Sequence, residues 1–354
     1  MTPKMRTAEG ATADSSRVRV GVIGTGAITQ VAHLPILAER PDVELMALAD
    51  VDQRKAEMLS RRFEVPLVMD SDEIVDFDLD AVVVATPNAT HEPIAMAALE
   101  RGKHVFVERP IAISSEGAMR MLRTAEKAGR SLTVGMPHRY RAEAVAIREL
   151  VAAGELGELR SVRGSRLMRS SPQAPTWRQS RDLAGGGALV DLGVTVIDLI
   201  LWLSGYPEVA RVSCVLSREG GDVEETASLM FVARDGPAFT VEVGNNFRGT
   251  YDSWFTGAIG TKGSVNYPPL TVSKEVGGRP TDVTPRLPRP SGGEDAYTNA
   301  YRRQIDEFVW TVKSWGGEDA PEYRLPMCQV ELMKLVEAAY RSAAEGREVV
   351  LAGS

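Results

Sequence analysis

Short hydrophobic runs alternate with amphipathic segments over the first 137 residues of the chain. The runs are rich in β-branched residues and almost free of polar ones, and they span 18–23, 43–49, 81–85, 104–107 and 131–134. Segments with helical periodicity separate them, at 28–39, 53–62, 91–101 and 116–128. Strands with nearly continuous hydrophobicity are covered on both faces, as in a parallel sheet flanked by helices. The pattern therefore predicts a doubly wound α/β domain over residues 18–137.

The pattern changes in the rest of the chain, residues 138–354. After a predicted helix at 142–153, hydrophobic and polar positions alternate at 160–166, 209–217, 226–233 and 239–244, which is typical of antiparallel strands with one covered face. The stretch 268–293 is rich in Pro and Gly, so we expect it to be a loop. Two helices, 297–314 and 328–345, and a short strand at 348–351 are predicted to close a second domain.

Composition and charge narrow the class of protein. The 354 residues are 44% hydrophobic and 25% charged, which is enough for two domains with cores of their own. The formal net charge of −7 argues against a nucleic-acid partner. Residues 1–17 lack the apolar run of a secretory signal and are expected to be a disordered tail. The most apolar stretch, 189–203, is too short to span a membrane and is predicted to be a buried helix.

Cysteine usage points to a reducing compartment. Cys214 and Cys328 lie 114 positions apart, and no residues with metal-ligand spacing surround them. None of the four histidines is paired with Cys or carboxylate at such spacing either, so no metal site is expected. We therefore expect reduced thiols and a cytoplasmic location.

A glycine-rich turn follows the first predicted strand and opens the first helix. Gly24 permits the tight turn, and Gly26 lets backbone N–H groups approach a pyrophosphate at the helix N-terminus. Thr29 replaces the usual third Gly or Ala, and its branched side chain is expected to push the helix away from the strand. Asp50 ends the second strand, where a carboxylate accepts hydrogen bonds from an adenosine ribose and repels a 2′-phosphate. These features predict NAD as the cofactor, with NADP kept as an alternative by Arg54.

Further motifs are spread over the whole chain. They are Thr86-Pro87-Asn88 with His91, GKHVFVERP at 102–110, GELGE at 154–158, Trp177-Arg178, GGGALVDLG at 185–193 and SAAEGREV at 342–349. Together they resemble the Gfo/Idh/MocA family, the relatives of glucose-fructose oxidoreductase and inositol dehydrogenase. The resemblance runs from about residue 18 to residue 351, which is nearly the full chain.

The resemblance implies an N-terminal Rossmann domain and a C-terminal α+β domain with an open, mostly antiparallel sheet, through which homodimers or homotetramers form. It implies NAD(P)-linked chemistry at a carbon of a sugar or cyclitol, in the cleft between the domains. The cofactor contacts that it implies fall on Gly24, Gly26, Ala27, Ile28, Asp50, Thr86, Pro87, Asn88, His91, Glu108 and Arg109. The implied substrate contacts fall on Arg139, Tyr140, Trp177 and Arg178. The peptide bond before Pro110 is expected to be cis.

Two proton-handling positions of the family are substituted in this chain. The family's Glu-Lys-Pro signature carries Arg109 here, and a guanidinium with a pKa above about 12 polarises a carbonyl but does not shuttle protons. The family's Asp-x-Gly-x-His pattern ends at Thr195, whose hydroxyl relays a hydrogen bond but is no base by itself. Asp191 and His138 therefore remain as candidates for proton transfer. For Asp198, two helical turns after Asp191, a structural pairing is favoured.

Arginines and aromatic residues near the predicted cleft have two interpretations. The arginines in the stretch 160–181 could bind a carboxylate or phosphate group of the substrate. For each of them except Arg178, however, a solvated surface position is the favoured interpretation. These arginines are Arg160, Arg163, Arg166, Arg169, Arg178 and Arg181. The aromatic residues of the helix at 297–314 lie partly on one face, which favours core packing. They are Tyr297, Tyr301, Phe308 and Trp310.

The sequence therefore predicts an NAD(P)-dependent oxidoreductase that acts on a C=O, CH–OH or imine group of a sugar, a cyclitol or a related polar ring. Its expected partners are a small-molecule substrate and further copies of the chain, with no nucleic acid and no membrane. The altered proton-handling positions leave two alternatives. One is an enzyme that retains its dinucleotide and catalyses elimination, cyclisation or isomerisation without net redox. The other is a non-catalytic cofactor-binding protein.

Overall fold

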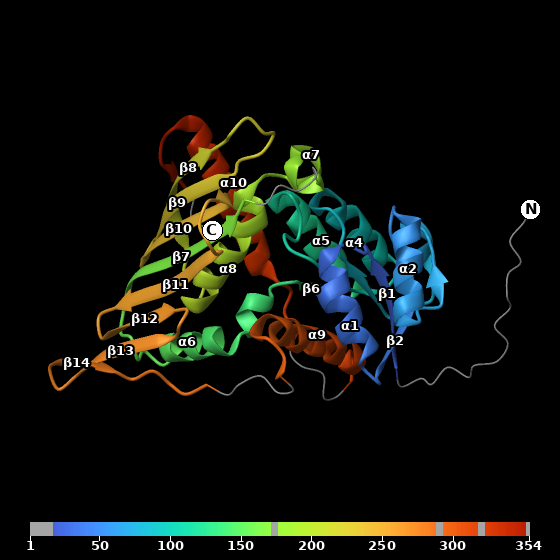
Figure 1. The fold of residues 1–354 in the computed structure, drawn as a ribbon, viewed down its shortest axis with the longest axis horizontal. Helices are drawn as coiled ribbons and strands as arrows, with labels where there is room; N and C mark the ends of the chain where they lie inside the picture. The colour runs from blue at the N-terminus through green and yellow to red at the C-terminus, as the bar shows by residue number, and fades with distance from the viewer. Residues whose placement is uncertain (1–16, 171–175, 288–292, 318–322, 352–354) are drawn as a thin grey trace, which may run out of the picture.

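The computed structural model describes residues 17–170, 176–287, 293–317 and 323–351. These residues form two sheets with their helices, which lie side by side (Figure 1). The predicted tail at 1–17 lies outside the described residues except for its last position.

The first sheet is parallel and has the strand order β3-β2-β1-β4-β5-β6. Its strands are β1 Val18–Ile23, β2 Val43–Ala49, β3 Leu67–Val68, β4 Ala81–Val84, β5 His104–Val107 and β6 Leu132–Val134. Its main helices are η1 Thr29–His33, α1 Leu34–Ala38, α2 Gln53–Phe63, α3 Ser71–Asp76, α4 His91–Glu100 and α5 Ser115–Ala128. The predicted doubly wound parallel sheet is confirmed. The order reverses between β1 and β4, which is where ligands bind in such sheets.

The second sheet has nine strands in the order β14-β13-β12-β11-β7-β10-β9-β8-β15. They are β7 Leu159–Arg169, β8 Val209–Ser217, β9 Thr226–Ala233, β10 Ala238–Phe247, β11 Ser253–Gly260, β12 Gly263–Tyr267, β13 Thr271–Val276, β14 Arg279–Asp282 and β15 Val349–Val350. Among the described strands of this sheet, only β7 and β10 pair in parallel. The mostly antiparallel second sheet is therefore confirmed.

The prediction of a loop at 268–293 is wrong for its first half. Residues 271–276 and 279–282 form the hairpin β13–β14, which turns at Gly277 and Gly278, both with positive φ. All four residues of β14, an edge strand of the sheet, are exposed. An exposed edge strand has no face to bury, so it lacks the alternation by which the other strands were recognised.

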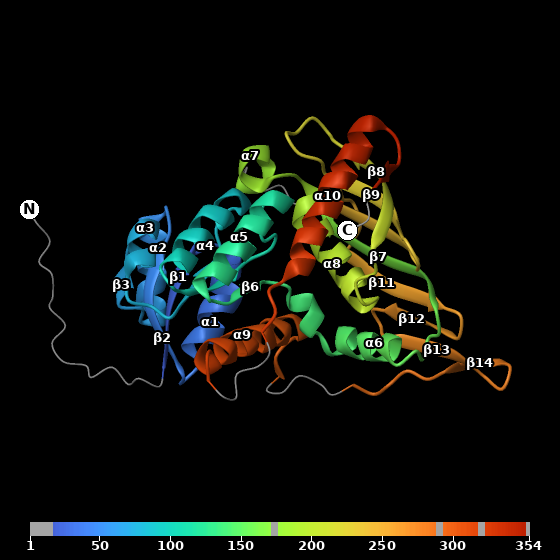
Figure 2. The same ribbon diagram turned by 180° about the vertical axis from the view of Figure 1, so that it is seen from behind.

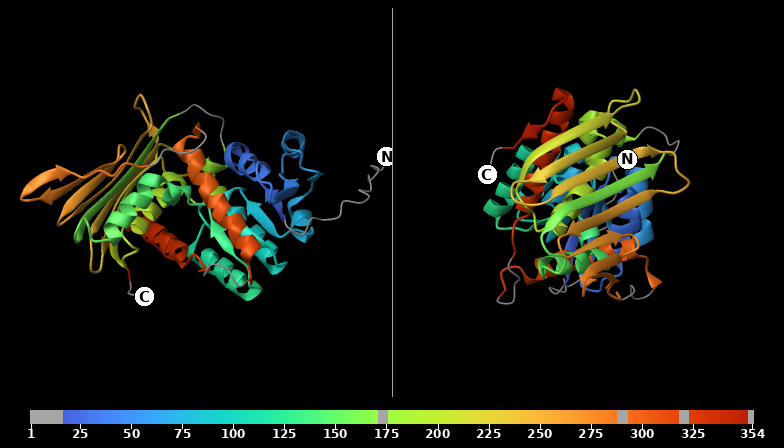
Figure 3. Two further views of the ribbon diagram at one scale, coloured as in Figure 1. Left: turned by 90° about the horizontal axis from the view of Figure 1, so that it is seen from below. Right: turned by 90° about the vertical axis from the view of Figure 1, so that its left-hand side faces the viewer.

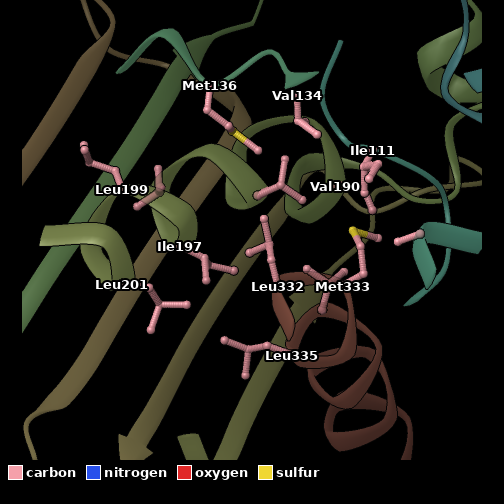
Figure 4. Packing of buried hydrophobic residues seen from close by; sticks show 14 of the residues in the cluster. Ile111, Val134, Met136, Val190, Ile197, Leu199, Leu201, Leu332, Met333 and Leu335 are labelled. Carbon is pink, nitrogen blue, oxygen red and sulfur yellow. The ribbon is translucent and has the colours of Figure 1, made fainter. Parts of the chain in front are cut away.

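Helices cover one face of the second sheet and leave the other face bare (Figure 3). The covering helices are α6 Ala142–Ala152, α8 Val194–Leu203 and α10 Met327–Glu345. Side chains of α8 and α10 interlock with Ile111, Val134 and Met136 from the first domain (Figure 4), so one core continues across both sheets. The helical stretch 181–203 is long and apolar enough to cross a membrane, but 89% of its apolar window is buried inside the protein. It is the predicted core helix, with the π-helix η5 Leu189–Gly193 leading into α8.

The helix α9, Ala296–Ser314, returns from the second domain to the first (Figure 2). Its buried residues Tyr301, Ile305 and Phe308 share a hydrophobic cluster with β1, α1 and Phe106. Trp310 points away from this cluster and is half-exposed. The first turn of α9 thereby lies beside the carboxyl ends of the parallel strands, next to the loop that follows β5.

Candidate active site

The turn after β1 has the backbone geometry that only glycine adopts easily. Gly24 has a φ of +96°, and a Cβ there would lie 2.3 Å from the carbonyl oxygen of Ala85. A Cβ on Gly26 would meet no protein atom within 4 Å. Gly26, Ala27 and Ile28 instead line a cavity of about 290 Å³, which we call the glycine-loop cavity. The turn thus leaves space for a ligand beside its backbone N–H groups.

Thr29 fits this turn, although the sequence led us to expect displacement of the helix. Its side chain is fully buried, and Oγ1 donates a hydrogen bond to the carbonyl oxygen of Gly24 at 2.7 Å. The helix begins as the π-helix η1 at this residue. The hydroxyl therefore ties the first helical turn to the glycine turn that precedes it.

Asp50 lies at the carboxyl end of β2 with both carboxylate oxygens engaged. Oδ2 accepts hydrogen bonds from the backbone N–H and the hydroxyl of Thr25, each at 2.6 Å, and Oδ1 accepts the N–H of Asp52 at 2.8 Å. Burial opposes the ionised form, but these hydrogen bonds and the charge of Lys55 outweigh it and lower the pKa of Asp50. A permanent negative charge therefore stands at this end of the glycine turn.

The ends of β4 and β5 supply most of the other walls of the glycine-loop cavity. The predicted site residues that line it are Gly26, Ala27, Ile28, Thr86, Asn88, His91, Glu108, Arg109, Trp177, Arg178 and Asp191. His91 is buried and bonds the carbonyl oxygens of Pro110 and Thr86 through its two ring nitrogens, at 2.8 and 2.9 Å. Burial lowers its pKa, although these two hydrogen bonds work in the opposite direction. Gly24, Asp50 and Pro87 are not among the lining residues.

Glu108 is a buried carboxylate at the end of β5. Its Oε1 accepts a hydrogen bond from Nε2 of His33 at 2.8 Å, and a Cβ on Gly135 would lie 2.9 Å from Oε2. Burial opposes ionisation of Glu108, but the hydrogen bond and charge of His33 together with the charge of Arg109 hold its pKa below the ordinary value. Glu108 is therefore an ionised acceptor on the wall of the cavity.

Arg109 follows Glu108, and its peptide bond to Pro110 is cis, as expected. Its guanidinium donates to the carbonyl oxygen of Asp191, and Nη1 lies 3.7 Å from Oδ1 of the same residue. Nε of Arg178 approaches this Oδ1 at 3.5 Å, while the guanidinium of Arg178 stacks over the ring of Trp177. Burial lowers the pKa of Arg109, but Asp191 and the neighbouring tyrosines and Glu108 more than reverse this effect. Arg109 therefore stays protonated.

A second cavity of about 270 Å³ lies between η3 (Pro137–Tyr140), α8 and the second sheet, and we call it the sheet cavity. Thr195 lines it with a side chain that is 4% exposed, and its Oγ1 has no hydrogen-bond partner among the described residues. His138 lines it too, and its Nε2 accepts a hydrogen bond from Nη1 of Arg166 at 3.1 Å. Burial, and then the charges of Arg166, Arg141 and Arg109, push the pKa of His138 well below its usual value. His138 is therefore neutral.

Tyr297 lines both cavities, and the sequence did not identify it as a site residue. Its hydroxyl donates to that of Tyr301 at 3.4 Å, and its ring packs edge-on against those of Tyr301 and His138. Helical periodicity had assigned both tyrosines to the core, and Tyr301 is indeed buried. Tyr297, in the first turn of α9, is half-buried and packs against the same cluster, but it also lines both cavities. That position was the available signal.

Two residues expected to contact substrate lie away from both cavities. Nε of Arg139 donates to Oδ2 of buried Asp198 at 2.7 Å, and Nη2 donates to Oδ1, which also accepts from Gln329 of α10. This ion pair joins the start of the second domain to α8 and α10. The backbone carbonyl of Tyr140 accepts from Arg303, and its hydroxyl bonds a carboxylate of the same helix, α9.

The arginines between 160 and 181 are dispersed. Arg166 lines the sheet cavity and Arg178 the glycine-loop cavity, whereas Arg163 lies on the bare outer face of the second sheet. Arg181 begins the short helix α7, Arg181–Ala184, and its guanidinium lies over the ring of Tyr340 in α10. No group of three His, Cys, Asp or Glu side chains suited to a metal occurs among the described residues. Cys214 and Cys328 are free thiols.

The chain is similar to known proteins along most of its length. A family model described as the oxidoreductase family with an NAD-binding Rossmann fold matches residues 18–136, and the model of the GFO/IDH/MocA C-terminal domain matches residues 144–266. Inositol 2-dehydrogenase of Rhizobium meliloti (strain 1021) is 26% identical over 95% of this chain and 99% of its own. GenD2 from gentamicin A biosynthesis, in complex with NAD, is 30% identical with a TM-score of 0.81 over 96% and 97% of the two chains. Levoglucosan dehydrogenase, in complex with NADH and L-sorbose, is 26% identical with a TM-score of 0.83 over 96% and 100%.

Proposed function

Because this chain belongs to the GFO/IDH/MocA family of NAD-dependent oxidoreductases, we propose that it transfers hydride between NAD and a hydroxyl-bearing carbon of a sugar or cyclitol where its two cavities meet. The observation that carries this proposal is the position of Tyr297, which lines both the glycine-loop cavity and the sheet cavity. A dinucleotide in the first cavity and a polyol in the second would be adjacent at this residue.

The residues of the glycine-loop cavity fit an NAD molecule. The open space in front of Gly26 suits a pyrophosphate at the start of η1, and the charge of Asp50 suits a ribose without a 2′-phosphate. Thr86, Asn88 and His91 line this cavity and would border the dinucleotide, with Pro87 between the first two in the chain turn, and Glu108 would accept a hydrogen bond from the nicotinamide ribose. When bound there, NAD supplies the hydride acceptor of the oxidation. We assign NAD and not NADP as the cofactor.

The proton of the reacting hydroxyl needs a group that can take it up. Arg109 holds its own proton, and Asp191 is occupied by two guanidinium groups. The ring nitrogen of His138 that faces Arg166 already accepts a hydrogen bond. The hydroxyl of Tyr297 is coupled to that of Tyr301 and lies at the boundary of the cavities, so we assign proton transfer to Tyr297.

The remaining side chains would orient the substrate. Arg109 and Asp191 would hold the oxygen of the reacting carbon, since both line the glycine-loop cavity close to Tyr297. The hydroxyl of Thr195 would donate to a second substrate oxygen. Trp177 and Arg178 would close the mouth of the glycine-loop cavity.

The assay begins with dinucleotide binding to the purified chain. Calorimetric titration should show saturable binding of NADH and at least about 10-fold weaker binding of NADPH, because Asp50 repels the 2′-phosphate. Incubation with NAD and a panel of sugars and inositols, neutral and acidic, should then form NADH in stoichiometric amounts with product. Failure of both dinucleotides to bind would refute the proposal. Product without NADH would establish the alternative without net redox.

We also propose that the protein is a cytoplasmic homo-oligomer that assembles through the outer face of the second sheet. Val215 is largely exposed and Met230 and Ile259 are about half-exposed on this face, and no helix covers it among the described residues. The free thiols Cys214 and Cys328 suit a reducing compartment.

A further inference from the structure

The sheet cavity holds two guanidinium groups besides the groups assigned above. Arg141 and Arg166 both line it, and the charge of Arg141 disfavours the charge of Arg166. Arg141 is fixed in place, because its guanidinium stacks over the ring of Trp254 at 4.9 Å and Nη1 donates to the hydroxyl of Tyr267 at 3.2 Å. Arg166 is fixed by its hydrogen bond to neutral His138.

Carboxylates near the cavity are engaged elsewhere. Asp252 lines the cavity but accepts the backbone N–H of Arg169 and pairs with its guanidinium at 3.8 Å. Asp191 lies between Arg109 and Arg178. Glu143 reaches Arg141 only through the hydroxyl of Tyr267, to which both are bonded.

Within the described parts of the chain, no carboxylate forms an ion pair with Arg141 or Arg166. Both arginines are partly buried, and burial followed by the charges of Arg109 and Arg141 lowers the pKa of Arg166, although the charge of Asp191 opposes this effect. The cost of burying these charges falls when an anion enters the cavity. A neutral sugar would supply no such charge.

Unused hydrogen-bond capacity points to the same place. Nε of Arg141 and Oγ1 of Thr195 are buried and have no partner among the described residues. Both residues line the sheet cavity, so both groups are available to an oxygen-rich ligand.

We propose that the sheet cavity binds an anionic group of the substrate, and that this enzyme therefore acts on acidic sugars or cyclitols that carry a carboxylate or a phosphate. The anion would bind between Arg141 and Arg166, with the hydroxyl of Thr195 as a further donor. The reacting carbon would then point to Tyr297 on the boundary with the glycine-loop cavity. The planar forks of two arginines match the paired oxygens of either anion. This inference rests on the proposed function, because it names the substrate class of the same site.

Binding without turnover tests the inference directly. The protein saturated with NADH is titrated by calorimetry with D-glucose, D-glucuronate, D-glucose 6-phosphate and inorganic phosphate. We expect at least one of the three anions to bind about 10-fold or more tightly than D-glucose, and their order shows whether the cavity favours a carboxylate or a phosphate. Anion affinities no greater than that of D-glucose, or no saturable binding of any anion, would overturn the inference. Dinucleotide binding and oxidation of neutral sugars would then still support the proposed function.

A pair of variants locates the anion. In Arg166→Leu the anion affinity should fall about 10- to 100-fold while the affinity for NADH stays the same, and Arg166→Lys should retain part of it. Arg160→Leu is the matched control, because Arg160 lies on the same strand, is exposed and lines neither cavity. Unchanged anion affinity in Arg166→Leu, or an equal loss in Arg160→Leu, would contradict the assignment. Thermal unfolding shows whether each variant is folded. If Arg166→Leu does not fold, the anion affinity of Arg166→Lys tests the assignment in its place.

Discussion

Tyr297 is the residue on which the proposed chemistry depends most, since the guanidinium of Arg109 and the hydroxyl of Thr195 are poor proton acceptors. Its hydroxyl approaches only Tyr301 at hydrogen-bond distance among the described residues, which leaves the oxygen accessible from the cavities that it borders. In the proposed function this phenol would take up the proton, and the dinucleotide contacts would not depend on it.

Tyr297→Phe should therefore lower kcat by about 100-fold or more, because the ring remains but the proton-transfer group is lost. The affinity for NADH and the KM for substrate should change little, and the pH dependence of kcat should differ from that of the unaltered enzyme. Steady-state kinetics across pH measure these effects. Tyr323→Phe is the control, since within the described ranges the Tyr323 hydroxyl bonds only the backbone of Leu132. Equal losses of activity in both variants would contradict the assignment.

His104 makes the stability of the first domain dependent on pH. It is buried on β5 with Nδ1 accepting the N–H of Ser131, and burial with the nearby charge of Arg130 lowers its pKa to about 4. In the unfolded chain His104 has a pKa near 6.5, so between pH 6.5 and pH 4 it binds a proton that it does not bind in the folded chain. The contribution of His104 is thus present above pH 6.5 and is lost progressively down to about pH 4.

Between pH 7 and pH 5 this single histidine should remove roughly 2 kcal/mol from the free energy of unfolding. His104→Asn keeps an acceptor for the Ser131 N–H but does not titrate, so its loss over the same range should be smaller by about that amount. Urea unfolding at the two pH values measures the difference. The same pH dependence in both proteins would show that His104 is not protonated on unfolding in this range.

Residues that belong to a local motif could be predicted from the sequence, and residues that distant segments bring together could not. Gly24 and Gly26 lie in the turn between the first strand and the first helix, and Asp50 directly follows the second strand. Their positions could therefore be predicted from the local sequence pattern. Arg141 and Tyr297 line the same cavity although they lie more than 150 positions apart in the sequence, and no local sequence pattern indicates that they are close. The sequence therefore predicted the cofactor side of the site in more detail than the substrate side.

The glycine turn shows how an element fixes both the fold and the binding of a ligand. Gly24 is required by the protein, because any Cβ would clash with the backbone of Ala85. Gly26 is not required by the protein, since its Cβ would enter open space. The two positions separate the structural requirement from the functional one within one turn.

Gly26→Ala should leave the melting temperature nearly unchanged but weaken NADH binding by about 10-fold or more, because the new methyl group lies where the dinucleotide would bind. Gly24→Ala should instead lower the free energy of unfolding by about 2 kcal/mol or more, through positive φ and the clash with Ala85. Calorimetric titration and thermal unfolding of both variants measure these effects. Tight NADH binding by Gly26→Ala would place the dinucleotide elsewhere.

Elements were predictable where burial imposes a period. The strands β8 and β9 have the predicted bounds, because one face of each packs on helices and the other does not. The hairpin β13–β14 was missed because its outer strand is exposed on every residue. The packing of α9 against the first domain was not predicted for another reason. The sequence shows the apolar face of this helix but does not show which residues that face contacts.

The whole molecule is joined by segments that cross between its two sheets. The helix α9 enters the core of the first domain, and α10 packs between α5 and the second sheet, where Glu337 accepts hydrogen bonds from Ser115 at 2.6 and 2.7 Å. Because Tyr297 lies on α9, it is held against the loops of the first domain while it faces the second. The two cavities are therefore kept in one fixed relation.

The bare face of the second sheet suits a second copy of the chain. Val215 is 72% and Met230 45% exposed there, and soluble proteins seldom leave a broad sheet face with such residues uncovered. Arg163 and Glu242 lie on the same face, so the surface carries charges of both signs. A two-fold axis through such a face brings each residue close to complementary ones on its copy.

Met230→Glu should therefore lower the molecular mass in solution to that of a smaller species, because a two-fold contact buries the new carboxylate near its equivalent. Size-exclusion chromatography with light scattering measures the mass, and NADH titration checks that the site is intact. Met58→Glu is the matched control, since Met58 is similarly exposed on α2 in the first domain, far from this face. A monomeric unaltered protein at tens of micromolar, or an unchanged mass in Met230→Glu, would show that the chain does not associate through this face.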